Sequence, residues 1–136
     1  MSVILCHSRN GVEDIVDAVY YIAEVAHAKN GLDLVAYAYQ ALEHLCRFVG
    51  SEAEALEQMA IAMEYGANKP EYGRNNWKKG MEWSRLVDAA QRHGLAIIKG
   101  EDIDMDSGNR HVAHMLASIH MLLGNQAMNI GTNDLY

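Results

Sequence analysis

Carboxylates and histidines are concentrated in one short stretch of this sequence. The acids come first, and two histidines follow at a spacing of three, which places them on one face of a helix. Carboxylates suit Mg²⁺ or Mn²⁺, and two imidazoles on consecutive helical turns can reach one transition metal ion. The stretch therefore predicts a metal site whose ligands are Glu101, Asp102, Asp104, His111 and His114. Among these, we expect Asp102, Asp104 and His111 to be the catalytic residues.

The same acids also have an ordinary structural explanation. Asp106 or Ser107 can cap a helix that begins near residue 109, and carboxylates before a helix are stabilised by its dipole. The stretch is not an EF-hand, because Gly108 comes one position late and Ala113 stands where the bidentate glutamate belongs. Metal binding and helix capping are therefore both compatible with this loop.

A second group of residues combines positive charge with aromatic rings. Phosphate needs cationic donors and a base needs a flat apolar face, and a loop together with the helix after it offers both. The sequence predicts a nucleotide-binding set that consists of Lys69, Tyr72, Arg74, Asn76, Trp77, Lys78, Arg85, Arg92 and His93.

Each part of this basic segment has a simpler explanation as well. Trp77 can anchor the loop to the core. Arg85 and Arg92 lie on one helix face, where either can pair with Asp88 in a salt-bridged surface. His93 points about 100° away from Arg92 around the helix, so the two need not share a site.

The elements that must position these groups are helical. Apolar residues recur at helical spacing over residues 12–29, 32–49, 51–66, 82–99 and 109–123. Ser51 with Glu54 three residues later is a capping box, whereas Asn30-Gly31 is typical of a helix end. We predict an all-α, single-domain bundle of about five helices, with ordered loops at 67–80 and 100–108.

The parts of this domain are expected to differ in role. Residues 1–50 would form a helical pair that acts as scaffold, with a short strand or arm at residues 1–10. Residues 51–124 would bind the nucleotide, and residues 125–136 would form a tail that is frayed or packed on a partner. The helices over 12–29, 32–49 and 109–123 are apolar over more than one stripe, which predicts burial on two sides and hence a homo-oligomer.

Composition limits the classes of partner. The chain has 136 residues, of which 50% are hydrophobic, enough for one domain without disulfides. A net charge of -7 argues against binding to a long nucleic acid, because that affinity depends on neutralising phosphates. Residues 69–110 nevertheless hold eight of the eleven Lys and Arg, so we expect a local positive field suited to a small anion.

The remaining polar and sulfur residues are expected to be structural. Cys6 and Cys46 lie in apolar runs without a C-x-x-C spacing, which predicts buried reduced thiols and a cytoplasmic protein. Neither a membrane span nor a signal peptide is recognisable. Trp83 is expected in the core, and structural roles are expected for His7, His27, His44 and His120.

Residues 56–123 resemble a phage protein family, the N-terminal domain of dATP/dGTP diphosphohydrolases. Its pattern is a helix ending in G-A-x-K, then Y-G-x-x-N-W, a glycine, R-L-x-x-A-x-x-R-H, G-E-D-x-D, S-G and H-x-x-H. Here the pattern falls on Gly66, Lys69, Tyr72, Gly73, Asn76, Trp77, Gly80, Arg85, Leu86, Arg92, His93, Gly100, Glu101, Asp102, Asp104, Ser107, Gly108, His111 and His114. Two departures are an insertion around Pro70-Glu71 and the helical pair before residue 51.

A weaker similarity is to the all-α, MazG-like nucleotide pyrophosphohydrolases, whose metal sites use E-E-x-x-E on one helix and E-x-x-D on the next. Residues 13–17, EDIVD, are similar to the second half of that pattern. Glu52, Glu54 and Glu57 do not have the spacing of the first half. A magnesium site of the MazG type is therefore not expected.

The family resemblance leads to two main hypotheses. The first is an enzyme, active in the infected host cell, that hydrolyses a purine deoxynucleoside triphosphate to monophosphate and pyrophosphate with Mg²⁺ or Mn²⁺. The acidic and histidine residues would then hold the metal, while Arg74, Lys78, Arg85 and Arg92 would neutralise phosphoryl charge. The alternative is a non-catalytic phage protein that binds and sequesters a nucleotide or a nucleotide-derived signalling molecule. A helical interaction module without a small-molecule site is the third, purely structural interpretation.

Overall fold

Helices account for almost all regular structure in the computed structural model, which describes residues 11–69 and 76–135. In chain order the elements are α2 Val12–Ala26, α3 Gly31–Val49, α4 Glu52–Ala67, the short 3-10 helix η1 Asn76–Lys79, α5 Trp83–Ile98 and α6 His111–Met128. The predicted all-α bundle is thus confirmed over the described residues. The strand or arm predicted for residues 1–10 lies outside them.

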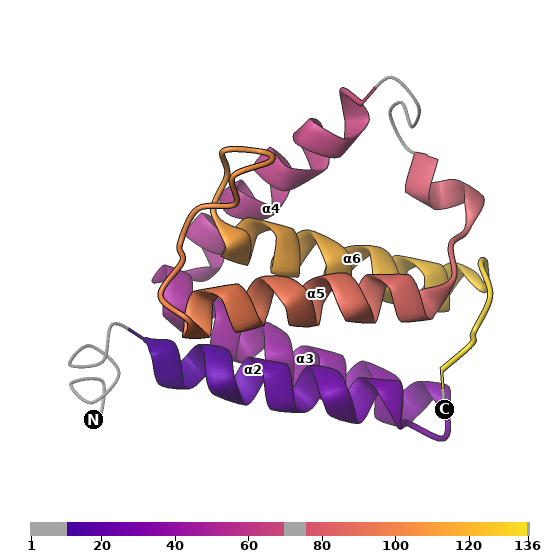
Figure 1. The fold of residues 1–136 in the computed structure, drawn as a ribbon. Coiled ribbons are helices and arrows are strands. Elements are labelled where there is room, and N and C mark those ends of the chain that lie inside the picture. The colour runs from indigo at the N-terminus through magenta and orange to yellow at the C-terminus, as the bar shows by residue number, and fades with distance from the viewer. Residues whose placement is uncertain (1–10, 70–75, 136) are drawn as a thin grey trace.

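The helices are stacked so that α6 lies at the centre. Figure 1 shows α2 and α3 side by side below α5 and α6, with α4 crossing α6 on the far side. The first two turns of α6 are buried almost completely, including Val112, Met115 and Leu116. The wide apolar surface of this helix is therefore covered within the chain, by α3 and α5 on one side and α4 on the other. The homo-oligomer stays a prediction.

Two helix starts depend on local capping. Ser51 accepts a hydrogen bond from the backbone N–H of Glu54 at 3.1 Å, as the capping box predicts. Asn30 likewise caps α3, because its side chain accepts the N–H of Asp33 at 2.8 Å. The interpretation of Asn30-Gly31 as the end of the first helix was wrong, since α2 already ends at Ala26.

The start of α6 also differs from the prediction. Arg110 occupies the N-cap position, and neither Asp106 nor Ser107 caps the helix. The loop before α6 folds back on itself instead: the backbone N–H of Asp104 donates to the carbonyl of Asn109 at 2.8 Å, and that of His111 donates to the carbonyl of Asp102 at 2.8 Å. These bonds hold Ser107 at the tip of a turn, where its hydroxyl serves the neighbouring side chains.

The C-terminal tail packs on its own chain, so the prediction of a frayed tail was wrong, whereas its packing on a partner stays a prediction. The helix continues past Gly124 to Met128 and turns at Asn129, which has a left-handed backbone conformation with φ 52°. Trp83 then donates from its indole Nε1 to the carbonyl of Ile130 at 3.1 Å, and its backbone N–H donates to Thr132 at 3.0 Å. Trp83 is buried, as predicted.

The cysteines and the length of the helices were also subjects of the sequence predictions. Cys46 is a free, partly buried thiol whose pKa is raised by burial, and Cys6 lies outside the described residues. Of the helices that the structure describes, none combines the length and apolar character needed to cross a membrane.

Candidate functional site

Three histidines and one aspartate meet where the end of α5 lies beside the start of α6. The Nδ1 atom of His93 is 2.8 Å from that of His111, and the rings of His93 and His114 stack with centroids 4.7 Å apart. Asp104 comes from the loop between the helices, and its Oδ2 is 3.4 Å from Nε2 of His114. The ligand atoms of His93, Asp104 and His111 all lie within 4.8 Å of one another, as a metal site requires.

A serine fixes the aspartate in this group. The hydroxyl of Ser107 lies 2.8 Å from Oδ2 of Asp104 and 2.7 Å from Nε2 of His114, and it accepts the backbone N–H of Asn109 at 3.1 Å. The set is satisfied when His114 donates from Nε2 to Ser107 and Ser107 donates to the Asp104 carboxylate. This relay leaves the second carboxylate oxygen of Asp104 available to a ligand.

Protonation favours metal binding at neutral pH. Burial, together with the neighbouring rings of His114 and His111, lowers the pKa of His93 to about 4. Burial also lowers the pKa of His114, against the opposing effect of Asp104. The pKa of Asp104 is raised by burial, but hydrogen bonds from Ser107 outweigh this and hold it below its ordinary value. At pH 7 His93 and His114 are therefore neutral and Asp104 is charged, the states that coordinate a cation.

The strongest sign of a missing partner is on His111. Its side chain is buried, and its Nε2 atom has no hydrogen-bond partner among the described residues. Its Nδ1 atom faces that of His93, so one of the two rings donates this bond and the other accepts it. A buried polar atom without a partner costs free energy unless a ligand satisfies it.

Positive charge reaches this group from α4. The ammonium of Lys69 lies 5.0 Å from the ring centroid of Tyr65, and that ring stands edge-on to His114 at 5.9 Å. Lys69 also contributes to the lowered pKa of His114, after burial. An anion bound at the histidines would therefore meet Lys69 at the end of α4.

Comparison with known proteins connects this geometry to a family. Residues 37–134 match the family described as dATP/dGTP diphosphohydrolase, N-terminal. The chain belongs to that family. A protein named dATP/dGTP diphosphohydrolase, from Salmonella phage PMBT28, is 40% identical over 73 residues, which cover 52% of this chain and 24% of that protein. This family member thus spans about a quarter of its relative's length. No solved structure matches the chain.

The family match confirms the predicted resemblance and extends it at both ends. It begins inside α3 and ends in the docked tail, so all residues of the histidine group lie within it while α2 lies outside. The division of the chain into a scaffold at 1–50 and a nucleotide-binding region at 51–124 stays a prediction.

The predicted metal ligands separate into two sets. Asp104, His111 and His114 come together, and His93, which we predicted as a nucleotide contact, joins them. Asp102 is instead turned toward Arg110, whose Nε donates to its Oδ1 at 3.1 Å, and Glu101 is exposed. The position of His93 was missed because spacing within α5 says nothing about which side chains of α6 it will face.

The predicted nucleotide contacts are more dispersed. Trp77 packs against α6, where a Cβ on Gly124 would lie 2.6 Å from its ring, so it does anchor η1 to the core. Its ring also stands 5.5 Å from His120, with Lys78 above it at 5.8 Å. Asn76 is partly buried beside it in η1, whereas Tyr72 and Arg74 lie outside the described residues.

The arginines of α5, Arg85 and Arg92, are exposed. Within the described part of the chain, Asp88 forms no ion pair with Arg85 or Arg92, so the predicted salt-bridged surface is not found. Arg92 is close enough to His93 to contribute to its lowered pKa, after burial and the two neighbouring histidines. Arg92 is therefore the α5 cation best placed to act at the histidine group.

His120, which contacts Trp77, can report the positive charge of Lys78 in η1 through its pKa. Burial lowers the pKa of His120, and the ammonium of Lys78 lowers it further. We expect Lys78→Met to raise the pKa of His120, because the repulsion disappears while the contact of the ring with Trp77 remains. Titration of the histidine ring signals by NMR measures this change, and Lys79→Met is the matched control. An unchanged His120 titration in Lys78→Met would show that the two side chains do not interact.

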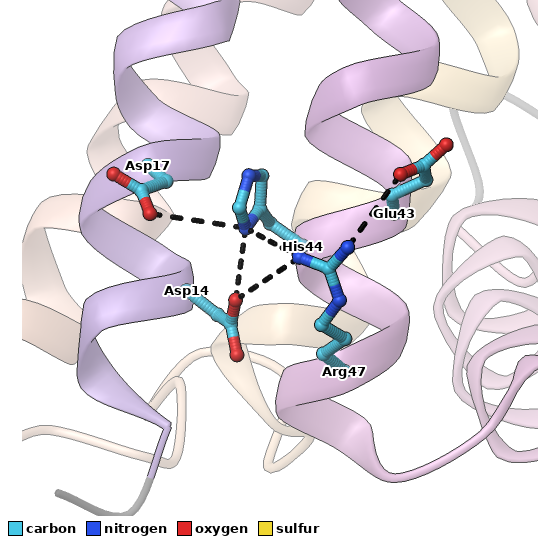
Figure 2. Close-up of polar contacts among 5 residues, drawn as sticks. All are labelled: Asp14, Asp17, Glu43, His44 and Arg47. Carbon is cyan, nitrogen blue, oxygen red and sulfur yellow. Dashed lines mark hydrogen bonds and ion pairs between the residues drawn. The ribbon is translucent and has the colours of Figure 1, made fainter. Parts of the chain in front are cut away.

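A second polar group joins α2, which lies outside the matched region, to α3. Nδ1 of His44 lies 2.8 Å from Oδ1 of Asp14 and 3.9 Å from Oδ2 of Asp17. Figure 2 shows that Arg47, from the next turn of α3, reaches Nδ1 of His44 and Oδ1 of Asp14 with one terminal nitrogen. The other terminal nitrogen lies 3.6 Å from Oε2 of Glu43. His44 thus has a structural role, as predicted: it links α3 to α2 by bonding to Asp14, 30 residues away in the chain.

This second group does not resemble a metal site. Asp14 and Asp17 belong to the segment that is similar to half of the MazG pattern, yet both face His44, and Asp14 also faces the guanidinium of Arg47. The ligand atoms of these residues do not converge closely enough to form a candidate metal group in the described structure. Arg47 supplies the positive charge that a cation would otherwise bring.

Proposed function

We propose that this chain binds a purine deoxynucleoside triphosphate and hydrolyses it to the monophosphate and pyrophosphate with a divalent metal ion. The proposal is carried by the group of His93, Asp104 and His111, whose ligand atoms lie within 4.8 Å of one another. The substrate class comes from the name of the phage relative, dATP/dGTP diphosphohydrolase.

The donor set fits a transition metal ion better than Mg²⁺. Imidazole nitrogen suits zinc, iron and nickel best, and Mn²⁺, a first-row transition metal ion, binds it more readily than Mg²⁺, which prefers oxygen ligands, of which this group offers only Asp104. His93, His111 and Asp104 would hold the ion, and His114 and Ser107 would orient Asp104. Of the two ions predicted from the sequence, the geometry favours Mn²⁺.

The chain's own residues would position the reacting groups. When bound, a divalent ion polarises a phosphoryl oxygen and lowers the pKa of a bound water. Lys69 and Arg92 flank the histidines and would attract the triphosphate. In the proposed reaction the oxygen of water bonds to the α-phosphorus, the bond to the bridging oxygen breaks, pyrophosphate leaves and one proton is released.

A binding protein without catalysis is the second candidate. Two observations favour it: the metal group contains a single carboxylate, and the matched relative is a much longer chain. A protein of this kind would hold the nucleotide through the same histidines and cations and release it unchanged. It would act by sequestering a nucleotide or a nucleotide-derived signalling molecule.

One assay separates the two candidates. The purified protein is incubated with dGTP or dATP and Mn²⁺, and the products are separated by ion-exchange chromatography. We expect monophosphate and pyrophosphate in equal amounts, with no product when the metal is removed by EDTA. Recovery of intact nucleotide from the denatured complex would favour the binding protein. A protein that neither cleaves nor retains either nucleotide would contradict both.

A further inference from the structure

A cavity lies at the opposite end of α6 from the histidine group. Its volume is about 190 Å³, and its walls come from four segments: the turn between α2 and α3, the start of α5, the end of α6 and the docked tail. Figure 1 shows the end of the tail next to the turn between α2 and α3, and residues of both segments line the cavity. From His111 to Gln126 the helix rises about 22 Å, so the cavity is separate from the proposed metal site.

The walls of the cavity carry amides that the fold does not use. Gln126 and Asn129 line it, and in the described structure their side chains form no hydrogen bond. The other two amides that line it are engaged locally: Asn30 caps α3, and Asn133 accepts the backbone N–H of Leu135 at 3.1 Å. Gln126 and Asn129 thus offer a donor and an acceptor each to a ligand.

Apolar side chains and one cation form much of the rest of the lining. Leu34 and Trp83 are buried core residues that also face the cavity, and Leu135 closes it from the tail. The indole of Trp83 is held in place by its bond to Ile130, so this wall exists before any ligand arrives. Lys29 is exposed and also lines the cavity.

We infer that this cavity is a binding site for a nucleobase, as a nucleoside or nucleotide, distinct from the metal site. A planar base presents adjacent donors and acceptors at its edge, which amide side chains can match in pairs. Its faces need an apolar wall, to which Trp83, Leu34 and Leu135 contribute. Lys29 would lie near a 5′-phosphate if the ligand carries one. The inference does not rest on hydrolysis, and the two can fail separately.

Binding can be measured without metal and without a cleavable phosphate. In a Trp77→Phe background, Trp83 is the remaining tryptophan and reports on the cavity. Titration with deoxyadenosine, deoxyguanosine and thymidine in EDTA is expected to change its fluorescence saturably for at least one nucleoside, with a dissociation constant below about 1 mM. Deoxyribose alone is expected to have no effect. Saturation by deoxyribose, or by none of the nucleosides, would overturn the inference.

Two variants locate the binding. Gln126→Met keeps the size of the side chain but removes the amide, and Asn129→Gly suits the left-handed backbone at that position. Each is expected to weaken binding about tenfold, because one or two hydrogen bonds to the base are lost. Gln40→Met, an exposed amide on α3 outside the cavity, is the matched control. Equal affinity in all three variants would place the nucleoside elsewhere and contradict the site.

Discussion

Replacing His111 with alanine is expected to abolish retention of Mn²⁺ or Zn²⁺ by the folded protein and, with it, the proposed hydrolysis. His111 is one of the two histidines in the candidate metal group of His93, Asp104 and His111. Its Nε2 atom has no hydrogen-bond partner in the described structure. Since loss of even a supporting residue lowers metal affinity 10- to 100-fold, we expect a loss of about 100-fold or more for a ligand. Metal content per chain after dialysis, measured by mass spectrometry, reports the effect.

The control for this variant is a histidine on another part of the surface. His27 is exposed at the end of α2, so His27→Ala should retain as much metal as the unchanged protein. Circular dichroism shows whether His111→Ala remains folded, and His93→Ala provides a second ligand variant from a different helix. A folded His111→Ala that binds the ion as tightly as His27→Ala would remove the basis for the metal site.

The acidic loop shows where the sequence pattern was not enough to predict the positions of the side chains. The sequence predicts Glu101, Asp102 and Asp104 as equivalent ligands, but only Asp104 lies in the histidine group. Alternation of acids along a loop does not define which way each side chain turns. The turn is decided by Arg110, which pairs with Asp102, and by Ser107, which pairs with Asp104. Both partners are visible in the sequence, but their geometry is not.

The helices were predictable because their apolar residues repeat with the helical period and because short polar motifs mark some of their ends. The capping box at Ser51 is an example, since it requires only two residues three positions apart. Contacts between distant elements follow from packing, which the sequence pattern does not report. The tail is bound through Trp83 and Ile130, 47 residues apart, and the metal group needs α5 to lie against α6.

The contact between Asp14 and His44 also follows from the packing of two helices. It leads to a prediction about stability. The Asp14 side chain is 5% exposed, its Oδ1 bonds to His44, and its Oδ2 has no partner in the described structure. His44→Ala is expected to lower the free energy of unfolding by about 2–4 kcal/mol, because it leaves a buried carboxylate with only the exposed Arg47 at 3.7 Å. Chemical denaturation measures this loss. Asp17→Ala should cost about 0–1 kcal/mol, because Asp17 is largely exposed and lies 3.9 Å from the same nitrogen.

A double variant separates the hydrogen bond from the packing of the ring. His44 also stacks on Tyr21 with centroids 5.8 Å apart, so some of the loss in His44→Ala comes from that contact. If the orphaned Asp14 carboxylate is the main cost, Asp14→Ala combined with His44→Ala will be less destabilised than the sum of the two single variants, because no charge is left buried. If the two losses simply add, then Asp14 and His44 are not coupled, and the stacking on Tyr21 accounts for the effect of His44.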